Sequence, residues 1–199
     1  MQSYSLDLLL KEDSALLLYS SIEADMNIFS KLFAAILACE MRVSAASIDT
    51  EESGIKKCRF LLSQVDATSE LKKAVQILKK DLTKLFTEGL DISMYISSHP
   101  EVFFDFALSE DTPADEHLVK VAQGKSPGLL ALKLSALTKK SFFFDLCTML
   151  QMKEVEFSKL QAKREQDLLH LRADIILETD QDVSVSDLYN FEDEIRNIL

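Results

Sequence analysis

Residues 129–178, LLALKLSALTKKSFFFDLCTMLQMKEVEFSKLQAKREQDLLHLRADIILE, decide the fold that the sequence predicts. This stretch contains no Gly and no Pro, and apolar residues recur along it at steps of three and four. They are Leu132, Ala136, Phe143, Leu146, Leu150, Phe157, Leu160, Leu168, Leu171 and Ile175, with Lys139, Lys153 and Arg164 interrupting the series. Such spacing places side chains on one narrow stripe of a helix. We therefore expect a single helix over 129–178, about 75 Å long from the rise per residue of an α-helix.

A helix of that length needs neighbours of similar length, and two other segments repeat apolar residues at the same steps. The first is 14–47, whose stripe contains Ile22, Met26, Phe29, Phe33, Ile36 and Val43. The second is 55–98, whose stripe contains Cys58, Leu61, Val65, Val75, Leu78, Leu82, Leu85, Ile92 and Ile96. Gly89 interrupts the second segment and predicts a bend there, because Gly within a helix costs about 1 kcal/mol relative to Ala.

Shorter helices are expected around the prolines and at the C-terminus. Ser98 with Glu101 matches a capping box around Pro100, and Thr112 with Asp115 resembles one with Pro113 at the first helical position, which predicts helices over 100–109 and 113–123. Ser184 and Asp187 form a possible capping pair before a stripe of Leu188, Phe191, Ile195 and Ile198. No repeat of fixed length is evident along the chain.

The predicted fold class is therefore all-α: an elongated antiparallel bundle of three long helices with coiled-coil-like seams, two short connecting helices and a C-terminal amphipathic helix. The bundle domain would span 1–183, and 184–199 would form a helix able to dock elsewhere. In helix count and length, this outline is similar to that of BAR-type membrane-curvature modules. Those modules use a basic membrane face, whereas this chain is acidic.

Composition limits the partners and the compartment. The net charge of −11 over 199 residues disfavours nucleic acid and makes a membrane surface an unfavourable partner. Residues 1–54 carry 3 basic and 9 acidic side chains and 55–98 carry 8 basic and 5 acidic, so the Lys-rich second segment can face either the acidic first segment or anionic lipid. Three widely spaced cysteines indicate reduced thiols and a cytoplasmic location.

Motifs for chemistry are weak. Residues 124–128 match the G-x-S-x-G pattern of hydrolases, but Pro127 follows the serine and has no N–H for an oxyanion hole. The histidines, His99, His117 and His170, lack the spacing of a metal site. We expect no catalytic residue, no cofactor and no metal, and hence no enzyme.

The expected function is that of a non-enzymatic scaffold or assembly subunit that binds proteins through helical faces and forms homo- or hetero-oligomers. Two alternatives stay open: a secretion-type chaperone or exported helical protein, and a BAR-like membrane-curvature module. Three consecutive phenylalanines cover about 200° of a helix, more than one packing face, so a partner is expected to cover some of them. The candidate partner-binding residues are Phe142, Phe143, Phe144, Leu188, Phe191, Ile195 and Ile198. The alternative for the last four is docking on their own bundle.

Overall fold

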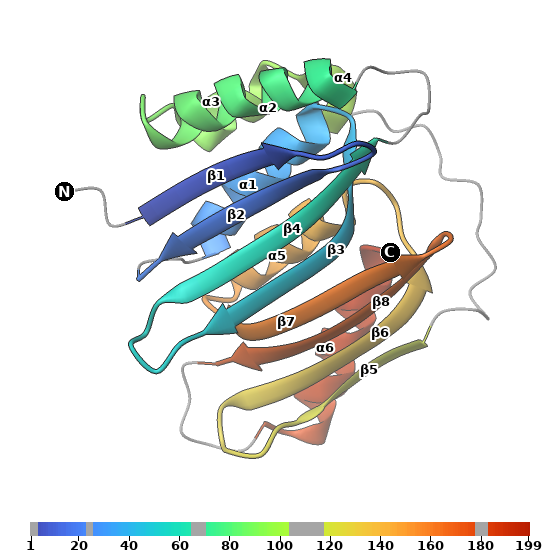
Figure 1. Ribbon diagram of the computed structural model, residues 1–199. Coiled ribbons are helices and arrows are strands. Elements are labelled where there is room, and N and C mark those ends of the chain that lie inside the picture. The colour runs from blue at the N-terminus through green and yellow to red at the C-terminus, as the bar shows by residue number, and fades with distance from the viewer. Residues whose placement is uncertain (1–3, 23–25, 65–70, 104–117, 178–182) are drawn as a thin grey trace.

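One eight-stranded antiparallel sheet dominates the computed structural model, which describes residues 4–22, 26–64, 71–103, 118–177 and 183–199 (Figure 1). The strand order is β1-β2-β4-β3-β7-β8-β6-β5. The strands are β1 Tyr4–Leu10, β2 Ala15–Ser21, β3 Met41–Thr50, β4 Lys56–Gln64, β5 Leu118–Gln123, β6 Leu129–Leu137, β7 Glu156–Glu165 and β8 Leu168–Ile176. The helices are α1 Met26–Ala38, α2 Leu71–Phe86, α3 Ile92–Ser97, α4 Pro100–Phe103, α5 Phe142–Met152 and α6 Val185–Asn197.

The predictions of an all-α class, a helical bundle and coiled-coil seams are wrong. None of the three long helices is present: 14–47 contains β2, α1 and the start of β3, 55–98 contains β4, α2 and α3, and 129–178 contains β6, α5, β7 and β8. The expected helix over 113–123 is also wrong where it can be judged, since β5 occupies 118–123. The longest helix of the described residues, α2, has 16 residues. The bundle domain assigned to 1–183 is therefore a sheet domain.

The buried residues show why the helical interpretation failed. Along β6 they are Leu130, Leu132, Leu134 and Ala136, and along β8 they are Leu169, Leu171, Ala173 and Ile175. Both series have a period of two, which places alternate side chains on one face of a sheet. Both strands also carry leucine at positions outside this alternating series. A series of apolar residues at steps of three and four can therefore be found in the same sequence, and it suggested a helix.

Other sequence predictions are confirmed. Helix α6 begins where expected, with the Ser184 hydroxyl accepting a hydrogen bond from the Asp187 N–H at 3.2 Å. Gly89 has a φ of 72° and turns the chain between α2 and α3. The expected short helix over 100–109 begins at Pro100 as α4, and its remainder, 104–109, lies outside the described residues.

The chain consists of two structurally related halves. The order β1-β2-α1-β3-β4-α2 recurs as β5-β6-α5-β7-β8-α6, and the sheet order reads the same from either edge under this correspondence. Glu40 and Glu154 lie 114 positions apart, and each ends a central helix with a positive φ, 54° and 56°. A β-bulge follows at the same spacing, at Ser44 in β3 and Ser158 in β7. The repeat is thus marked by backbone geometry.

The two halves meet at the centre of the molecule. Strands β3 and β7 pair there, and behind them α1 packs on α5, with the rings of Phe33 and Phe143 stacked at a centroid distance of 5.2 Å. Lys56 of β4 forms an ion pair with Glu156 of β7 across the same join. Figure 1 shows α1, α5 and α6 behind the sheet, and none of the described helices crosses its other face, called the open face. One continuous core fills the helical side of both halves.

Candidate functional site

The two edges of the sheet differ although the halves are related. At the β5 edge, the backbone N–H of Val121 donates a hydrogen bond to a carboxylate oxygen of Glu192 on α6 at 3.3 Å. The Arg196 guanidinium of the same helix donates to the Val119 carbonyl at 3.2 Å and pairs with Glu192 at 2.8 Å. Phe191 and Ile195 bury the other face of α6 in the core. Helix α6 therefore satisfies two outward backbone groups of this edge strand, the Val121 N–H and the Val119 carbonyl.

The β1 edge has no such cover from the described residues. Strand β1 is joined to α2 by one hydrogen bond among the described residues. In it, the Tyr4 hydroxyl donates to the Phe86 carbonyl at 3.2 Å. Within the part of the chain that the structure describes, no side chain bonds to the backbone of Leu6, Leu8 or Leu10. An uncovered edge strand presents unpaired N–H and C=O groups and is a template for a further strand.

The hairpin geometry identifies which β1 groups face outward. The Lys11 N–H donates to the Ser14 carbonyl at 2.8 Å, which closes the β1–β2 hairpin. Hydrogen-bonded and non-bonded pairs alternate in an antiparallel ladder, so Leu9 bonds to β2 while Leu8 and Leu10 turn their backbone groups to the open side.

The related half gives the same answer. The register row Ala46, Phe60, Leu17, Leu8 runs from the centre to the β1 edge, and its counterpart Leu160, Ala173, Leu132, Val121 runs to the β5 edge. Leu8 thus occupies the position of Val121, whose N–H points away from β6 and to Glu192. Among the described residues, the outward N–H of Leu8 has no acceptor equivalent to Glu192.

A groove runs beside this edge. It has a volume of about 300 Å³ and is lined by Tyr4, Leu6 and Leu8 from β1 and by Lys79, Leu82, Thr83 and Thr87 from α2 and its end. The β1 residues that line the groove are also those whose backbone groups face outward. Side-chain direction and hydrogen bonding to the neighbouring strand both alternate with a period of two residues, so the two properties coincide at the same positions. A segment paired with β1 would direct every second side chain to the α2 side of the sheet. The volume lies at the low end of the range for ligand pockets.

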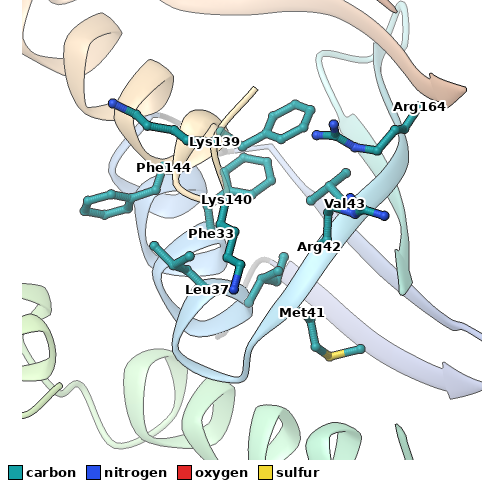
Figure 2. Close-up of a pocket in the computed structure, with 11 residues that line it drawn as sticks. Phe33, Leu37, Met41, Arg42, Val43, Lys139, Lys140, Phe144 and Arg164 are labelled. Carbon is teal, nitrogen blue, oxygen red and sulfur yellow. The ribbon is translucent and has the colours of Figure 1, made fainter. Parts of the chain in front are cut away.

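A second pocket lies where the two halves meet, between α1, α5 and β3 (Figure 2). Figure 2 shows Phe33 and Leu37 of α1 opposite Arg42 and Arg164 of the strands. Its volume of about 10 Å³ is enough for a single water molecule. Arg164 donates to the Asp167 carbonyl and the Thr138 hydroxyl, both within the protein, and burial, together with nearby Arg42, lowers its pKa. The pocket is too small for a substrate.

Buried nucleophiles are held in their protonated forms. Burial raises the pKa of the Cys39 and Cys58 thiols to about 12 and raises that of Cys147 well above its usual range. Burial also raises the pKa of Tyr95, whose hydroxyl donates to buried Asp81 at 3.0 Å. These groups lie inside the protein and outside both pockets, so their placement is structural. Among the described residues, no group of three or more His, Cys, Asp or Glu side chains is arranged to hold a metal ion.

The partner-binding residues predicted from sequence pack within their own chain. Phe142, Phe143, Phe191 and Ile195 are buried, and Phe144, Leu188 and Ile198 are half-buried against the same core. Phe103 covers the Phe144 ring at a centroid distance of 5.2 Å. The core thus covers Phe142 and Phe143, and the short helix α4 covers part of Phe144. Helix α6 packs on the half of the molecule to which it belongs. A partner-binding role for these residues stays a prediction.

The G-x-S-x-G segment forms the β5–β6 hairpin loop, in which the Gly124 N–H donates to the Leu129 carbonyl at 2.6 Å, so it has no strand-to-helix elbow. His117 lies outside the described residues. None of the described helices has the length and apolar character needed to cross a membrane.

The sequence matches no protein-family model, and no curated protein is detectably similar to it. Sequence reasoning missed the β1 edge, whose one signal was the leucine cluster at 6–10 ahead of a polar turn.

Proposed function

We propose that this protein is a non-enzymatic protein-binding module that accepts an extended segment of a partner along strand β1. The observation that carries the proposal is the difference between the two edges of one sheet. Two outward groups of β5, the Val121 N–H and the Val119 carbonyl, are satisfied by Glu192 and Arg196, whereas no described side chain bonds to the equivalent groups of β1, which lie beside a groove. Addition of a strand to an open edge is a recurrent mode of peptide recognition.

The binding energy has two sources. Each backbone hydrogen bond formed with β1 contributes about 0.5–1.5 kcal/mol. Apolar side chains of the segment add to this by covering Leu6, Leu8 and Leu82 in the groove. Main-chain bonds provide affinity for any extended segment, and the groove selects those with apolar residues at alternate positions.

Composition and thiol state support the remaining parts of the proposal. We place the protein in the cytoplasm, because Cys39, Cys58 and Cys147 are all unpaired thiols. Assembly through helical faces is replaced by assembly through a sheet edge, since the long helices on which the scaffold and membrane-curvature hypotheses rested are strands.

The test is selection of binders from a phage-displayed library of random peptides, followed by calorimetry with the purified full chain. Leu8→Pro removes the outward N–H without removing a bond to β2, and proline is tolerated at such edge positions. We expect this variant to bind selected peptides at least roughly tenfold more weakly, since it loses a hydrogen bond and gains a steric clash.

The matched control is Leu8→Ala, which shortens the side chain but keeps the N–H. We expect it to weaken binding by a smaller factor than Leu8→Pro. Peptides that bind wild type and Leu8→Pro with equal affinity would overturn the proposal. Pairing of β1 with a second copy of the chain would appear as a dimer that Leu8→Pro dissociates. The bound segment would then belong to a second copy of this protein and not to a different partner.

A secretion-type chaperone is the second candidate, and the extended geometry of the β1 edge favours it. A segment that must lie flat as a strand cannot at the same time belong to a folded helix of its own protein. Limited proteolysis of a copurified complex separates the two candidates. A chaperone would leave its partner cleavable beyond the bound segment, whereas a scaffold would leave the partner folded and resistant.

A further inference from the structure

The open face of the sheet is cationic in a protein of net charge −11. Its strand positions include seven exposed basic side chains: Lys57, Arg59, Lys120, Lys133, Lys159, Lys163 and Arg172. The acidic side chains on the same face are Asp7, Asp49, Asp174 and Glu165, of which Glu165 pairs with Lys163 at 2.7 Å. The excess of positive charge therefore lies on one surface, opposite the helices.

Three of these cations form a continuous row. Lys120 of β5 pairs directly with Lys133 of β6, and Lys133 pairs directly with Arg172 of β8. Directly opposed side chains in an antiparallel pair have their Cβ atoms about 4.5–5.5 Å apart, and like charges at that spacing are unfavourable. The row continues through Gln161 and Ser47 to Arg59, so no carboxylate enters it before the β1 edge.

No carboxylate of the described residues lies within ion-pair distance of Lys120, Lys133 or Arg172. Three basic side chains near the related elements do pair within the chain: Lys153 with Glu194, Lys139 with Asp145, and Arg196 with Glu192. A row of adjacent, unpaired cations needs neutralisation from outside the chain.

We propose that this row, Lys120, Lys133 and Arg172, is a docking surface for an acidic segment of a protein partner. Charge complementarity selects the partner, because the row supplies only positive charge and hydrogen-bond donors. Nucleic acid is disfavoured on two grounds. The net charge of −11 repels a long polyanion, and the open face has no Phe or Tyr on which bases could stack.

This surface is separate from the β1 edge, because it lies over β5, β6 and β8, next to the opposite edge of the sheet. A partner could engage one or both. The two claims can fail independently, because Leu8→Pro changes the edge and leaves the row intact.

The test is the fluorescence anisotropy of a labelled hexaglutamate peptide, short enough to lie on the row, titrated with the full chain at low and at high salt. We expect wild type to bind at low salt and to release the peptide at high salt. K120E/K133E/R172E should bind the peptide at least roughly tenfold more weakly, because three surface charge pairs are lost and replaced by repulsion. Leu8→Pro should bind as wild type does.

The matched control is K72E/K73E/K80E, which reverses three exposed lysines on α2 and gives the same net charge. We expect its affinity to stay within about twofold of wild type. Circular dichroism verifies folding, and K120Q/K133Q/R172Q replaces the reversal if that variant does not fold. Equal loss in both triple variants, loss in Leu8→Pro, no binding by wild type at low salt, or preference for a single-stranded RNA oligonucleotide would each overturn the proposal.

Discussion

The carboxylate of Glu192 accepts a hydrogen bond from the backbone N–H of Val121 at 3.3 Å, and through it a helix side chain takes the place of a neighbouring strand. Arg196 completes the same arrangement at the Val119 carbonyl. The related half has no counterpart among its described residues, although Leu8 stands at the position of Val121. Among the described residues, one edge of the sheet is thus covered by a helix and the other is not.

Removing this cover should open the second edge. We expect Glu192→Ala combined with Arg196→Ala to lower the free energy of unfolding by about 1–2 kcal/mol and to produce concentration-dependent self-association, because β5 then presents unpaired groups. Light scattering and urea unfolding measure both effects. Asp193→Ala, an exposed neighbour on α6, should change neither. A double variant that stays monomeric at all concentrations would show that the edge is protected in another way.

Asp81 should be critical for the attachment of α3 to α2. It is 4% exposed and accepts hydrogen bonds from the Tyr95 hydroxyl and from Lys84, each at 3.0 Å. Asp81→Ala leaves the Tyr95 hydroxyl buried without an acceptor, so we expect a loss of about 1–3 kcal/mol in urea unfolding. Asp81→Asn keeps an acceptor and should lose less. Equal losses for the two variants would contradict this role of the hydrogen bond.

Glycine should stabilise the two helix ends that sequence patterns failed to mark. Glu40 and Glu154 have φ values of 54° and 56°, which cost a residue with a Cβ about 1 kcal/mol. We expect Glu40→Gly and Glu154→Gly to raise the free energy of unfolding by a few tenths to about 1 kcal/mol each. Glu88→Gly, at a residue without a positive φ, should be neutral or destabilising. Thermal unfolding would contradict the interpretation if all three variants behaved alike.

These residues also explain how far the sequence could predict the fold. Glu40, Glu154 and Gln166 adopt the backbone conformation that Gly usually supplies, so three chain reversals carry no glycine and 129–178 looked uninterrupted. The C-terminal helix was predictable because its cap at Ser184 and its stripe are local. Strand pairing joins residues far apart in sequence, such as Ala46 and Ala162, and no local signal encodes it. The open β1 edge follows from that pairing and was equally hidden.

The thiols should be unreactive in the folded protein. Burial raises the pKa of Cys39 and Cys58 from 9.0 to about 12, so both keep their protons at pH 8. We expect an aromatic disulfide reagent to modify none of the three cysteines in the native protein and all three in guanidinium chloride. Rapid modification of Cys39 or Cys58 in the native protein would contradict their burial.

The same shifts give stability a pH dependence of definite sign. Because these pKa values are higher in the folded than in the unfolded protein, the folded state holds more protons between about pH 9 and pH 12. Stability should be unaffected by these thiols below pH 9 and should fall as the pH rises above it. Urea unfolding at pH 7 and at pH 10 measures the fall, and Cys39→Ala with Cys58→Ala should reduce it. A double variant with an unchanged pH slope would assign the effect to other groups.

Backbone hydrogen exchange at Leu8 tests the open edge most directly. In the isolated protein the outward Leu8 amide should exchange rapidly, whereas the Val121 amide, bonded to Glu192, should exchange slowly. Addition of a selected peptide should slow exchange at Leu8 by about tenfold or more and leave Val121 unchanged. A Leu8 amide that is already protected in the isolated protein, or that exchanges at the same rate with peptide bound, would contradict recognition at strand β1.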